Sequence, residues 1–255
     1  MLDKHYTTDV ITLKSYDLND ADKILVMYSK EKGLMRSVAK GIKRPKSKLG
    51  SRLDLLMANN LQLSRGRNMD TICQAQTINN FKDIREDISK LMISSYISEI
   101  VANYGMENDP SSNEVYELLY RAIENISRAE TKVQILLGAL KFQLKMMYLT
   151  GVMPELNYCV GCRKELTTQD MYFSVEKGGV FCSCCNTVSN HSVEIPYKVR
   201  DFLYTLLNTN FEDESEYEKK ATEKVCLVCF NLLKDYLTKH SSKKFKSDKI
   251  LASIL

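Results

Sequence analysis

The stretch FCSCCNT, residues 181–187, brings Cys182, Cys184 and Cys185 within four positions. A second pair, Cys159 and Cys162, lies upstream in YCVGC. The two Cys-x-x-Cys pairs are separated by 19 residues, and four-thiolate zinc sites typically have about 15–20 residues there. Two residues between thiolates allow one tight turn to direct both sulfurs at a single ion. The spacing therefore predicts one structural Zn²⁺ bound by Cys159, Cys162, Cys182 and Cys185. Cys184 is expected outside the ligand set, and Cys184 in place of Cys185 is the alternative.

The segment between the two pairs can return the chain as a hairpin. MYFSV (171–175) has strand composition, Glu176-Lys177-Gly178-Gly179 can form the turn, and VFC follows. Glycine supplies the positive φ that such turns need. This pattern predicts a zinc ribbon at about residues 154–192. A redox or disulfide role, or burial as metal-free core thiols, are the alternatives.

The other cysteines have no second pair to match. Cys226 and Cys229 lie in the apolar, helical stretch KVCLVCFNLL, and Cys73 lies in an expected strand. Free cysteine is one of the residue types most often buried. We therefore expect all three to be core thiols.

Residues 6–80 alternate between apolar and polar positions in five short segments. YTTDVITLKSY, ILVMYS (24–29) and LMRSVAKG are followed by segments around 55–63 and 71–78. Five short strands in so short a stretch predict a small barrel of the OB type.

After Phe81 the apolar period changes from two to that of a helix. Apolar stripes run through residues 88–104, 115–126 and 133–147, and further helical stretches are expected at 197–207 and 216–239. The expected fold class is thus α+β and multidomain. An OB-fold domain at 1–80 precedes an α-helical domain at 81–255, which contains the ribbon.

Positive charge is concentrated in the N-terminal third. Residues 1–80 hold 14 Lys and Arg against 8 Asp and Glu, whereas the whole chain has a net charge of +4. Within it, KGIKRPKSKLGSR (40–52) contains six cations and no acid, which predicts a DNA-binding loop. The alternative is a solvated surface run. The six candidate DNA-binding residues are Lys40, Lys43, Arg44, Lys46, Lys48 and Arg52.

Aromatic residues are few in this region, so we expect phosphate contacts to dominate binding. If all six cations met phosphates, the log–log salt slope would be roughly −4 on single strands.

Several function classes are disfavoured. No apolar run approaches the ~18 residues of a transmembrane helix, and the N-terminus has no apolar signal region, so we expect a cytoplasmic protein. Histidine occurs three times and never beside an obvious nucleophile, and neither GxxxxGK(S/T) nor GxGxxG is present. We therefore expect that the chain is not an enzyme.

The order of a barrel with a basic loop, a helical region and an inserted ribbon resembles the bacterial RecO family of recombination mediators. GVMPELNYCVGC (151–162) is similar to the family's entry into the ribbon, and FSVEKGGVFCSCC (173–185) is similar to its exit. The run through KGIKRPKSKLGSRL (40–53) resembles the family's strand and loop region. The resemblance covers essentially the whole chain, and the ribbon motifs are its most specific part. Arg163 departs from the family pattern, because glycine is common after the first pair.

The resemblance implies a DNA repair and recombination mediator that binds single- and double-stranded DNA and anneals complementary strands. It also implies partners: RecR, the acidic C-terminal tail of single-strand-binding protein and, indirectly, RecA, which is loaded onto coated strands. Activity at the bacterial nucleoid follows from this role. Chemistry alone offers helix cations as candidates for binding the acidic tail, although each is as well explained as an ordinary surface charge: Arg121, Arg128, Lys132, Lys141 and Lys145.

Two rival functions fit parts of the pattern. A zinc-ribbon nucleic-acid-binding accessory factor of another process would share the barrel and the metal site. A thiol oxidoreductase would use the CSCC cysteines without a metal. Annealing of strands coated with single-strand-binding protein separates a recombination mediator from the accessory factor, and zinc stoichiometry separates it from the oxidoreductase.

Overall fold

The structure, a computed structural model, describes residues 3–166, 171–186, 192–247 and 251. Its contacts divide the chain into two compact units. The first runs to Ala129 and also includes Lys246, Ser247 and Leu251, and the second comprises Glu130–Phe245.

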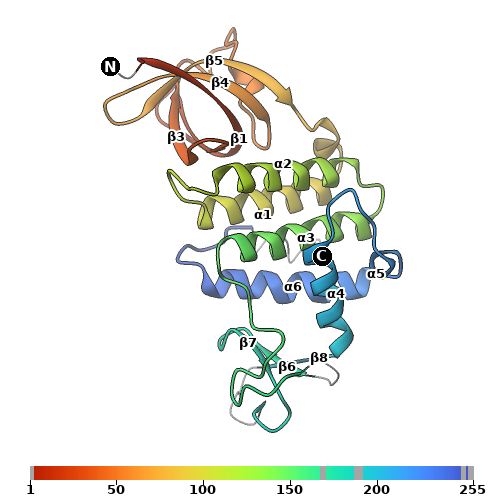
Figure 1. Ribbon diagram of the computed structural model, residues 1–255. Coiled ribbons are helices and arrows are strands. Elements are labelled where there is room, and N and C mark those ends of the chain that lie inside the picture. Colours follow the sequence, from red (N-terminus) through yellow and green to blue (C-terminus); the bar gives the residue numbers. More distant parts are fainter. Residues whose placement is uncertain (1–2, 167–170, 187–191, 248–250, 252–255) are drawn as a thin grey trace. The chain divides into compact units, whose positions relative to one another are not determined.

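The first unit contains a closed barrel of five strands in the order β1-β2-β3-β5-β4 (Figure 1). Neighbours are antiparallel except for the short parallel pairing of β3 with β5. This order confirms the OB-type barrel expected from the sequence. The strands are β1 (His5–Asp17), β2 (Lys23–Ser29), β3 (Gly33–Ala39), β4 (Ala58–Ser64) and β5 (Asp70–Asn79).

The long strand β1 closes the barrel because it pairs on both sides. Its first half pairs with β4, from His5 opposite Ser64 onwards, and its second half pairs with β2, ending with Asp17 opposite Lys23. Alternate residues of each strand point inward, and the interior is filled by aliphatic side chains such as Leu25.

Two helices complete the first unit, α1 (Ile88–Tyr104) and α2 (Ser112–Arg128). Both pack against the barrel strands β1 and β2. Asp87 caps α1 by accepting hydrogen bonds from the backbone N–H groups of Ser89 and Lys90. The packing explains why β2 is apolar on both faces: Tyr28 is fully buried, and its hydroxyl donates to Asp109 in the connection between the helices.

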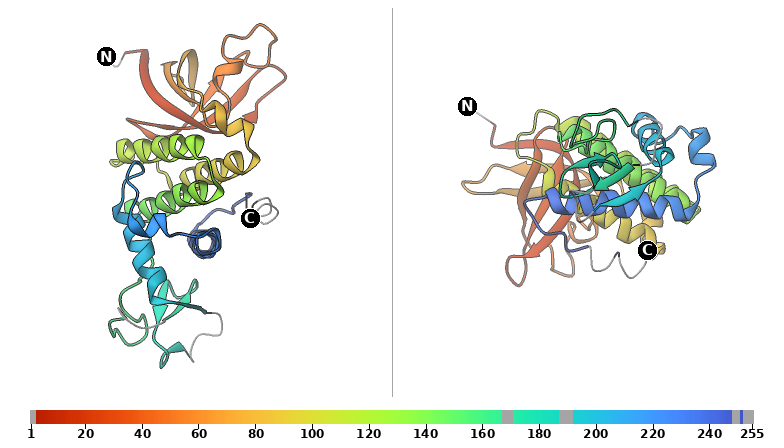
Figure 2. Two further views of the ribbon diagram at one scale, coloured as in Figure 1. Left: turned by 90° about the vertical axis from the view of Figure 1, so that its right-hand side faces the viewer. Right: turned by 90° about the horizontal axis from the view of Figure 1, so that it is seen from below.

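The second unit is built on α3 (Lys132–Leu149), which begins with a capping box formed by Thr131 and Gln134. It packs against α6 (Glu223–His240) and α4 (Tyr197–Asn208) (Figures 1 and 2). The helical stretch expected at 216–239 is interrupted. It divides into α5 (Glu216–Lys219) and α6, because Thr222 is extended and caps α6 through the N–H of Val225.

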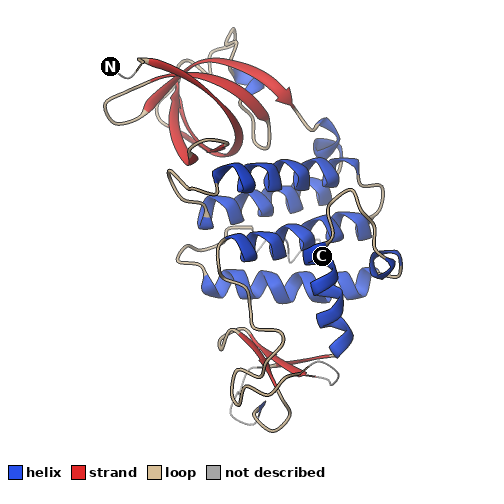
Figure 3. Cartoon of the chain, in the orientation of Figure 1, coloured by secondary structure: helices blue, strands red, loops and turns tan. Residues whose placement is uncertain are grey.

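The predicted ribbon hairpin is present in the second unit (Figure 3). It consists of β6 (Met171–Ser174) and β7 (Gly179–Phe181), joined by a turn in which Gly178 has a φ of 78°. A third strand that the sequence pattern did not indicate, β8 (Val193–Ile195), pairs with the other side of β6.

Candidate metal centre and nucleic-acid interface

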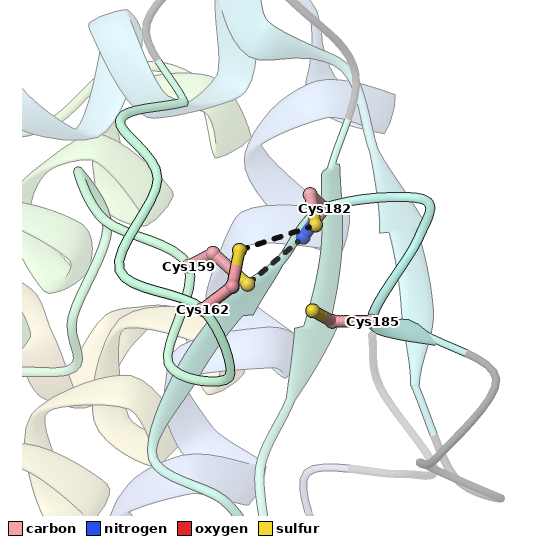
Figure 4. Close-up of side chains that lie close together, drawn as sticks. All are labelled: Cys159, Cys162, Cys182 and Cys185. Atoms are coloured by element: carbon pink, nitrogen blue, oxygen red, sulfur yellow. Dashed lines mark hydrogen bonds between the residues drawn. The ribbon is translucent and has the colours of Figure 1, made fainter.

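Four cysteines converge from two separate turns of the ribbon (Figure 4). Cys159 and Cys162 come from the loop after α3, and Cys182 and Cys185 follow β7. Their Sγ atoms all lie within 4.8 Å of one another, and those of Cys162 and Cys182 are 3.8 Å apart. A tetrahedral ion bound by four thiolates at about 2.3 Å holds its sulfurs about 3.8 Å apart. The cluster therefore has the dimensions of a four-thiolate zinc site.

Backbone hydrogen bonds shape each turn. The N–H of Arg163 donates to the carbonyl of Cys159, and the N–H of Cys185 donates to that of Cys182. Gly161 relieves a tight contact, because a Cβ there would lie 3.1 Å from the Cβ of Cys185. Arg163 has a φ of 62°, in the left-handed region that favours glycine. The resemblance noted glycine at this position, and the backbone shows why.

Without a cation, the thiols of the cluster differ in how readily they ionise. Burial opposes ionisation of Cys159, but backbone N–H groups of Cys162, Cys182 and Gly161 lower its pKa to about 6. Hydrogen bonds with Cys182 and Cys162 raise the pKa of Cys185 to about 12. One thiolate is thus favoured and a second is disfavoured. A divalent cation among the sulfurs would stabilise all four as thiolates, so the residues fit the metal.

The remaining cysteines lie outside this cluster. Cys184 is exposed and is not one of the four grouped residues. Cys226 and Cys229 are fully buried in α6, as expected, and burial raises their pKa values to about 11 and about 12. The expectation for Cys73 was wrong: it is exposed, because β5 directs its neighbour Ile72 into the barrel instead.

The basic loop leaves β3 and contains one short helical turn, Gly50–Arg52. Its base is fixed: the N–H of Gly41 donates to Asp22 at 2.6 Å, and Ile42 and Leu53 pack into the barrel core. The hydrogen bond from Gly41 is the main cause that lowers the pKa of Asp22. An anchored backbone thus presents the exposed side chains of Lys40, Lys43, Arg44, Lys46, Lys48 and Arg52.

The six cations differ in their present contacts. Lys43 forms a 3.0 Å ion pair with Asp17, and Arg52 donates to the carbonyl of Ala75 at 2.8 Å. Within the described part of the chain, four have side chains without a hydrogen bond or ion pair, and these are the ones free to meet phosphates: Lys40, Arg44, Lys46 and Lys48.

Two of the three α3 lysines that were expected to bind an acidic partner, Lys141 and Lys145, have structural contacts instead. Lys141 is 3 % exposed, and its ammonium pairs with Glu218 at 2.8 Å. It also donates to the carbonyls of Asn210 and Asp213. All three of its N–H groups are therefore used, which corrects the expectation for Lys141.

Lys145 is half-buried and donates to the carbonyl of Leu207 near the C-terminus of α4. Burial, with the neighbouring charge of Lys141, lowers its pKa. A lysine at this place stabilises the negative end of a helix, so Lys145 is better explained by packing than by partner binding.

The other three candidates are at the surface, and each has an acidic partner. Arg121 and Arg128 both form ion pairs with Glu124, which lies about one helical turn from each of them. Lys132 forms a 2.9 Å ion pair with Glu223 of α6. Exposed pairs of this kind contribute little stability. Each cation can therefore exchange its present carboxylate for that of a partner.

The structure also gathers cations that the sequence pattern had not singled out. Lys32 and Arg36 line a cavity of about 280 Å³ with Tyr6 and Asp70, and Arg65 lies over the Tyr6 ring. The available signal was the arginine-rich run SRGR (64–67), where the chain turns from β4 to β5.

Comparison with known proteins covers both parts of the chain. Residues 1–81 match the family model described as Recombination protein O N terminal, and residues 85–249 match Recombination protein O C terminal. The chain belongs to the RecO family. This is a family of DNA repair and recombination proteins, so the resemblance inferred from the ribbon motifs is confirmed.

Full-length relatives agree with the RecO assignment. The DNA repair protein RecO of Desulforamulus reducens is 31 % identical over 97 % of this chain and 94 % of its own length. That of Pelotomaculum thermopropionicum is 27 % identical over 96 % and 92 %, and that of Symbiobacterium thermophilum is 25 % identical over 98 % and 97 %. Among the described helices, none combines the length and the apolar character that crossing a membrane would require.

Proposed function

We propose that this RecO-family chain is a recombination mediator that binds single- and double-stranded DNA and anneals complementary strands. The observation that carries the proposal is the loop at 40–52, whose exposed cations project from an anchored backbone on an OB-type barrel. Such cations release counterions from DNA when they contact phosphates, which supplies affinity without reading sequence.

The chemistry of the loop suits annealing. Two strands pair faster when a protein screens both phosphate backbones and leaves the base edges free. The loop has no aromatic side chain, so it offers no platform on which bases would stack and be withheld from pairing. In this proposal residues 1–80 act as the nucleic-acid-binding domain, and residues 81–255 form the helical domain with the ribbon.

The proposed partners follow the family. We propose that the chain acts in the cytoplasm with RecR, that it binds the acidic tail of single-strand-binding protein, and that RecA is then loaded onto the exposed strand. The helix cations that can still exchange their present carboxylates for those of a tail are Arg121, Arg128 and Lys132.

The proposed cofactor is one structural Zn²⁺ held by Cys159, Cys162, Cys182 and Cys185. Four thiolates complete its tetrahedral coordination, so no position is left for a substrate or a reactive water. In the proposal the metal stabilises the ribbon, and the chain acts by binding rather than as an enzyme.

The decisive test is annealing of two complementary oligonucleotides that are coated with single-strand-binding protein, followed by fluorescence quenching. We expect the wild-type chain to accelerate pairing and a variant with Arg44, Lys46 and Lys48 changed to alanine to do so much less. A chain that binds DNA but leaves the annealing rate at its spontaneous value would instead be a nucleic-acid-binding accessory factor.

A further inference from the structure

The four residues of the cysteine cluster are not equally covered by protein. Cys159 is fully buried and Cys182 is 4 % exposed, whereas Cys162 is exposed and Cys185 is half-buried. The first cysteine of each Cys-x-x-Cys pair is thus enclosed, and the second lies toward solvent. A small soluble molecule can therefore reach the cluster at Cys162 while the ribbon is folded.

Hydrogen bonds also distinguish Cys162 from the buried Cys159. The Sγ of Cys159 accepts the backbone N–H of Cys182 at 3.4 Å, as Figure 4 shows. Among the residues that the structure describes, no backbone N–H donates to the Sγ of Cys162. A donated N–H stabilises the charge of a thiolate and so lowers its nucleophilicity. Hydrogen bonding thus favours Cys162 over Cys159 as the reactive ligand, and exposure favours it over Cys185.

Cys182 provides a reaction partner for Cys162. Their Sγ atoms lie 3.8 Å apart, and this contact joins the two turns of the ribbon (Figure 4). A disulfide holds its sulfurs about 2.05 Å apart, so the two atoms must approach by roughly 1.8 Å. The exposed turn that carries Cys162 can make this small movement, while burial shields Cys182 from direct attack.

We infer that Cys162 and Cys182 form an oxidation site for hydrogen peroxide, and that their conversion to a disulfide releases the zinc of the ribbon. The inference rests on the proposed zinc site and adds a chemical control of its stability. Only the thiolates of Cys159 and Cys185 remain after the reaction, and two ligands hold Zn²⁺ far less tightly than four. Because metal binding folds segments of this size, the oxidised ribbon loses its order.

The reaction takes two steps, which balance in atoms and electrons. The Cys162 thiolate attacks one oxygen of hydrogen peroxide and becomes a sulfenic acid, while the O–O bond breaks and the leaving hydroxide takes up a proton. The Cys182 thiolate then attacks the oxidised sulfur, the S–O bond breaks, and a second hydroxide takes up a proton. In sum, two thiolates, one peroxide and two protons give one disulfide and two waters.

Cys184 is the competing thiol, because it is exposed and adjoins Cys185 in the chain. It also supplies a matched control, since Cys184→Ser removes an exposed thiol from the same turn without removing a ligand. Cys73 is an exposed thiol in the first unit, and its oxidation reports that peroxide was effective.

The test treats zinc-loaded, full-length protein with hydrogen peroxide. Released zinc is followed with a metallochromic dye, free thiols are counted by alkylation, and disulfides are located by peptide mass mapping. Two ligand variants are compared, Cys162→His and Cys185→His. Histidine can replace one cysteine in a tetrahedral zinc site, so both variants keep four ligands, but only Cys185→His keeps both reacting thiols.

We expect the wild type to lose two thiols of the ribbon for each zinc released and to form a disulfide between Cys162 and Cys182. Cys162→His should keep its zinc at the same peroxide dose, whereas Cys185→His and Cys184→Ser should still release it. Dithiothreitol should restore both the thiols and zinc binding, because it reduces a disulfide but not a sulfinic acid. Peptide mapping of the wild type decides the question if Cys162→His does not hold zinc.

Three results would overturn the inference. A disulfide that includes Cys184, or zinc release that Cys184→Ser abolishes, would make Cys184 the reactive thiol. Zinc that stays bound while Cys73 is oxidised would show that the cluster resists peroxide, and the proposed cofactor would stand. If the purified chain neither contains nor takes up zinc, the proposed cofactor fails together with the inference.

Discussion

Cys182 and Cys184 are two residues apart in the chain and have different surroundings. Cys182 is 4 % exposed and belongs to the sulfur cluster, whereas Cys184 is exposed and does not. We expect Cys182→Ser to release zinc and to lower thermal stability, because three thiolates hold the ion less tightly. Cys184→Ser should change neither property by much. Metal content after gel filtration and a thermal melt measure both, and equal losses in the two variants would mean that the ligand assignment is wrong.

Arg163 offers a second prediction at the scale of one residue. Its left-handed backbone costs an L-residue about 1–2 kcal/mol, which glycine would avoid. Glycine would lose about 0.5–1 kcal/mol of this advantage, because it has more conformational freedom in the unfolded chain. Arg163→Gly should therefore raise the free energy of unfolding by up to about 1 kcal/mol.

Arg163→Ala is the matched control, because alanine keeps the backbone cost and removes only an exposed side chain. Denaturant unfolding of both variants in zinc-containing buffer measures the difference. A gain in the alanine variant as large as in the glycine variant would assign the effect to the side chain rather than to the backbone.

How far a residue's role could be predicted depended on where its partners lie in the chain. The cysteine ligands were predicted because each pair is local and its spacing reflects a turn. Lys141 could not be predicted, since the carbonyls and the carboxylate that bury its charge belong to residues 210–218, about 70 positions further along. A lysine on an apolar stripe has the same local pattern whether it is exposed or paired.

At the scale of elements, the loop at 40–52 gives a quantitative prediction. Changing Arg44, Lys46 and Lys48 to alanine should make the log–log salt slope for single-stranded DNA about 2 less negative, because three phosphate contacts are lost. The fold should be retained, since none of the three side chains bonds to another described residue. Titrations at several salt concentrations measure the slope.

Arg52→Ala serves as the contrasting variant in that experiment. Its guanidinium donates to the carbonyl of Ala75 in β5, so we expect its loss to lower thermal stability more than it changes the salt slope. If the triple variant kept the wild-type slope, the loop would be a solvated surface run.

The elements themselves were predictable to different degrees. The five strands and α1, α2 and α3 were evident from periods of two and of 3.6, because one face of each is buried. The strand β8 has three residues, of which Val193 and Glu194 are exposed, so its pattern is too short and too polar to indicate a strand. The break before α6 depends on a single cap at Thr222, and the residues around it, EYEKKATEK (216–224), are mostly helix formers that conceal it.

At the scale of the molecule, the two compact units predict that loss of metal has a local effect. The cysteine cluster belongs to the second unit and the basic loop to the first. Chelation should therefore unfold the ribbon, whose zinc contributes on the order of 10 kcal/mol to its own folding, while affinity for DNA is kept.

Far-UV circular dichroism and DNA anisotropy, before and after a strong chelator, check this expectation. Cys182→Ser without chelator is the matched control and should reproduce the chelated state. Loss of DNA affinity in step with zinc release would instead make the ribbon part of the binding surface.

The double pairing of β1 also affects how the protein can form during synthesis. Val10 lies opposite both Ser29 in β2 and Asn59 in β4. Ser29 leaves the ribosome soon after β1, but Asn59 lies 49 residues after Val10, and closing a loop of that length slows folding. Until β4 arrives, the first half of β1 exposes unpaired amides that invite association with other nascent chains. The earliest strand of the barrel is therefore the one that most needs protection while the chain is being made.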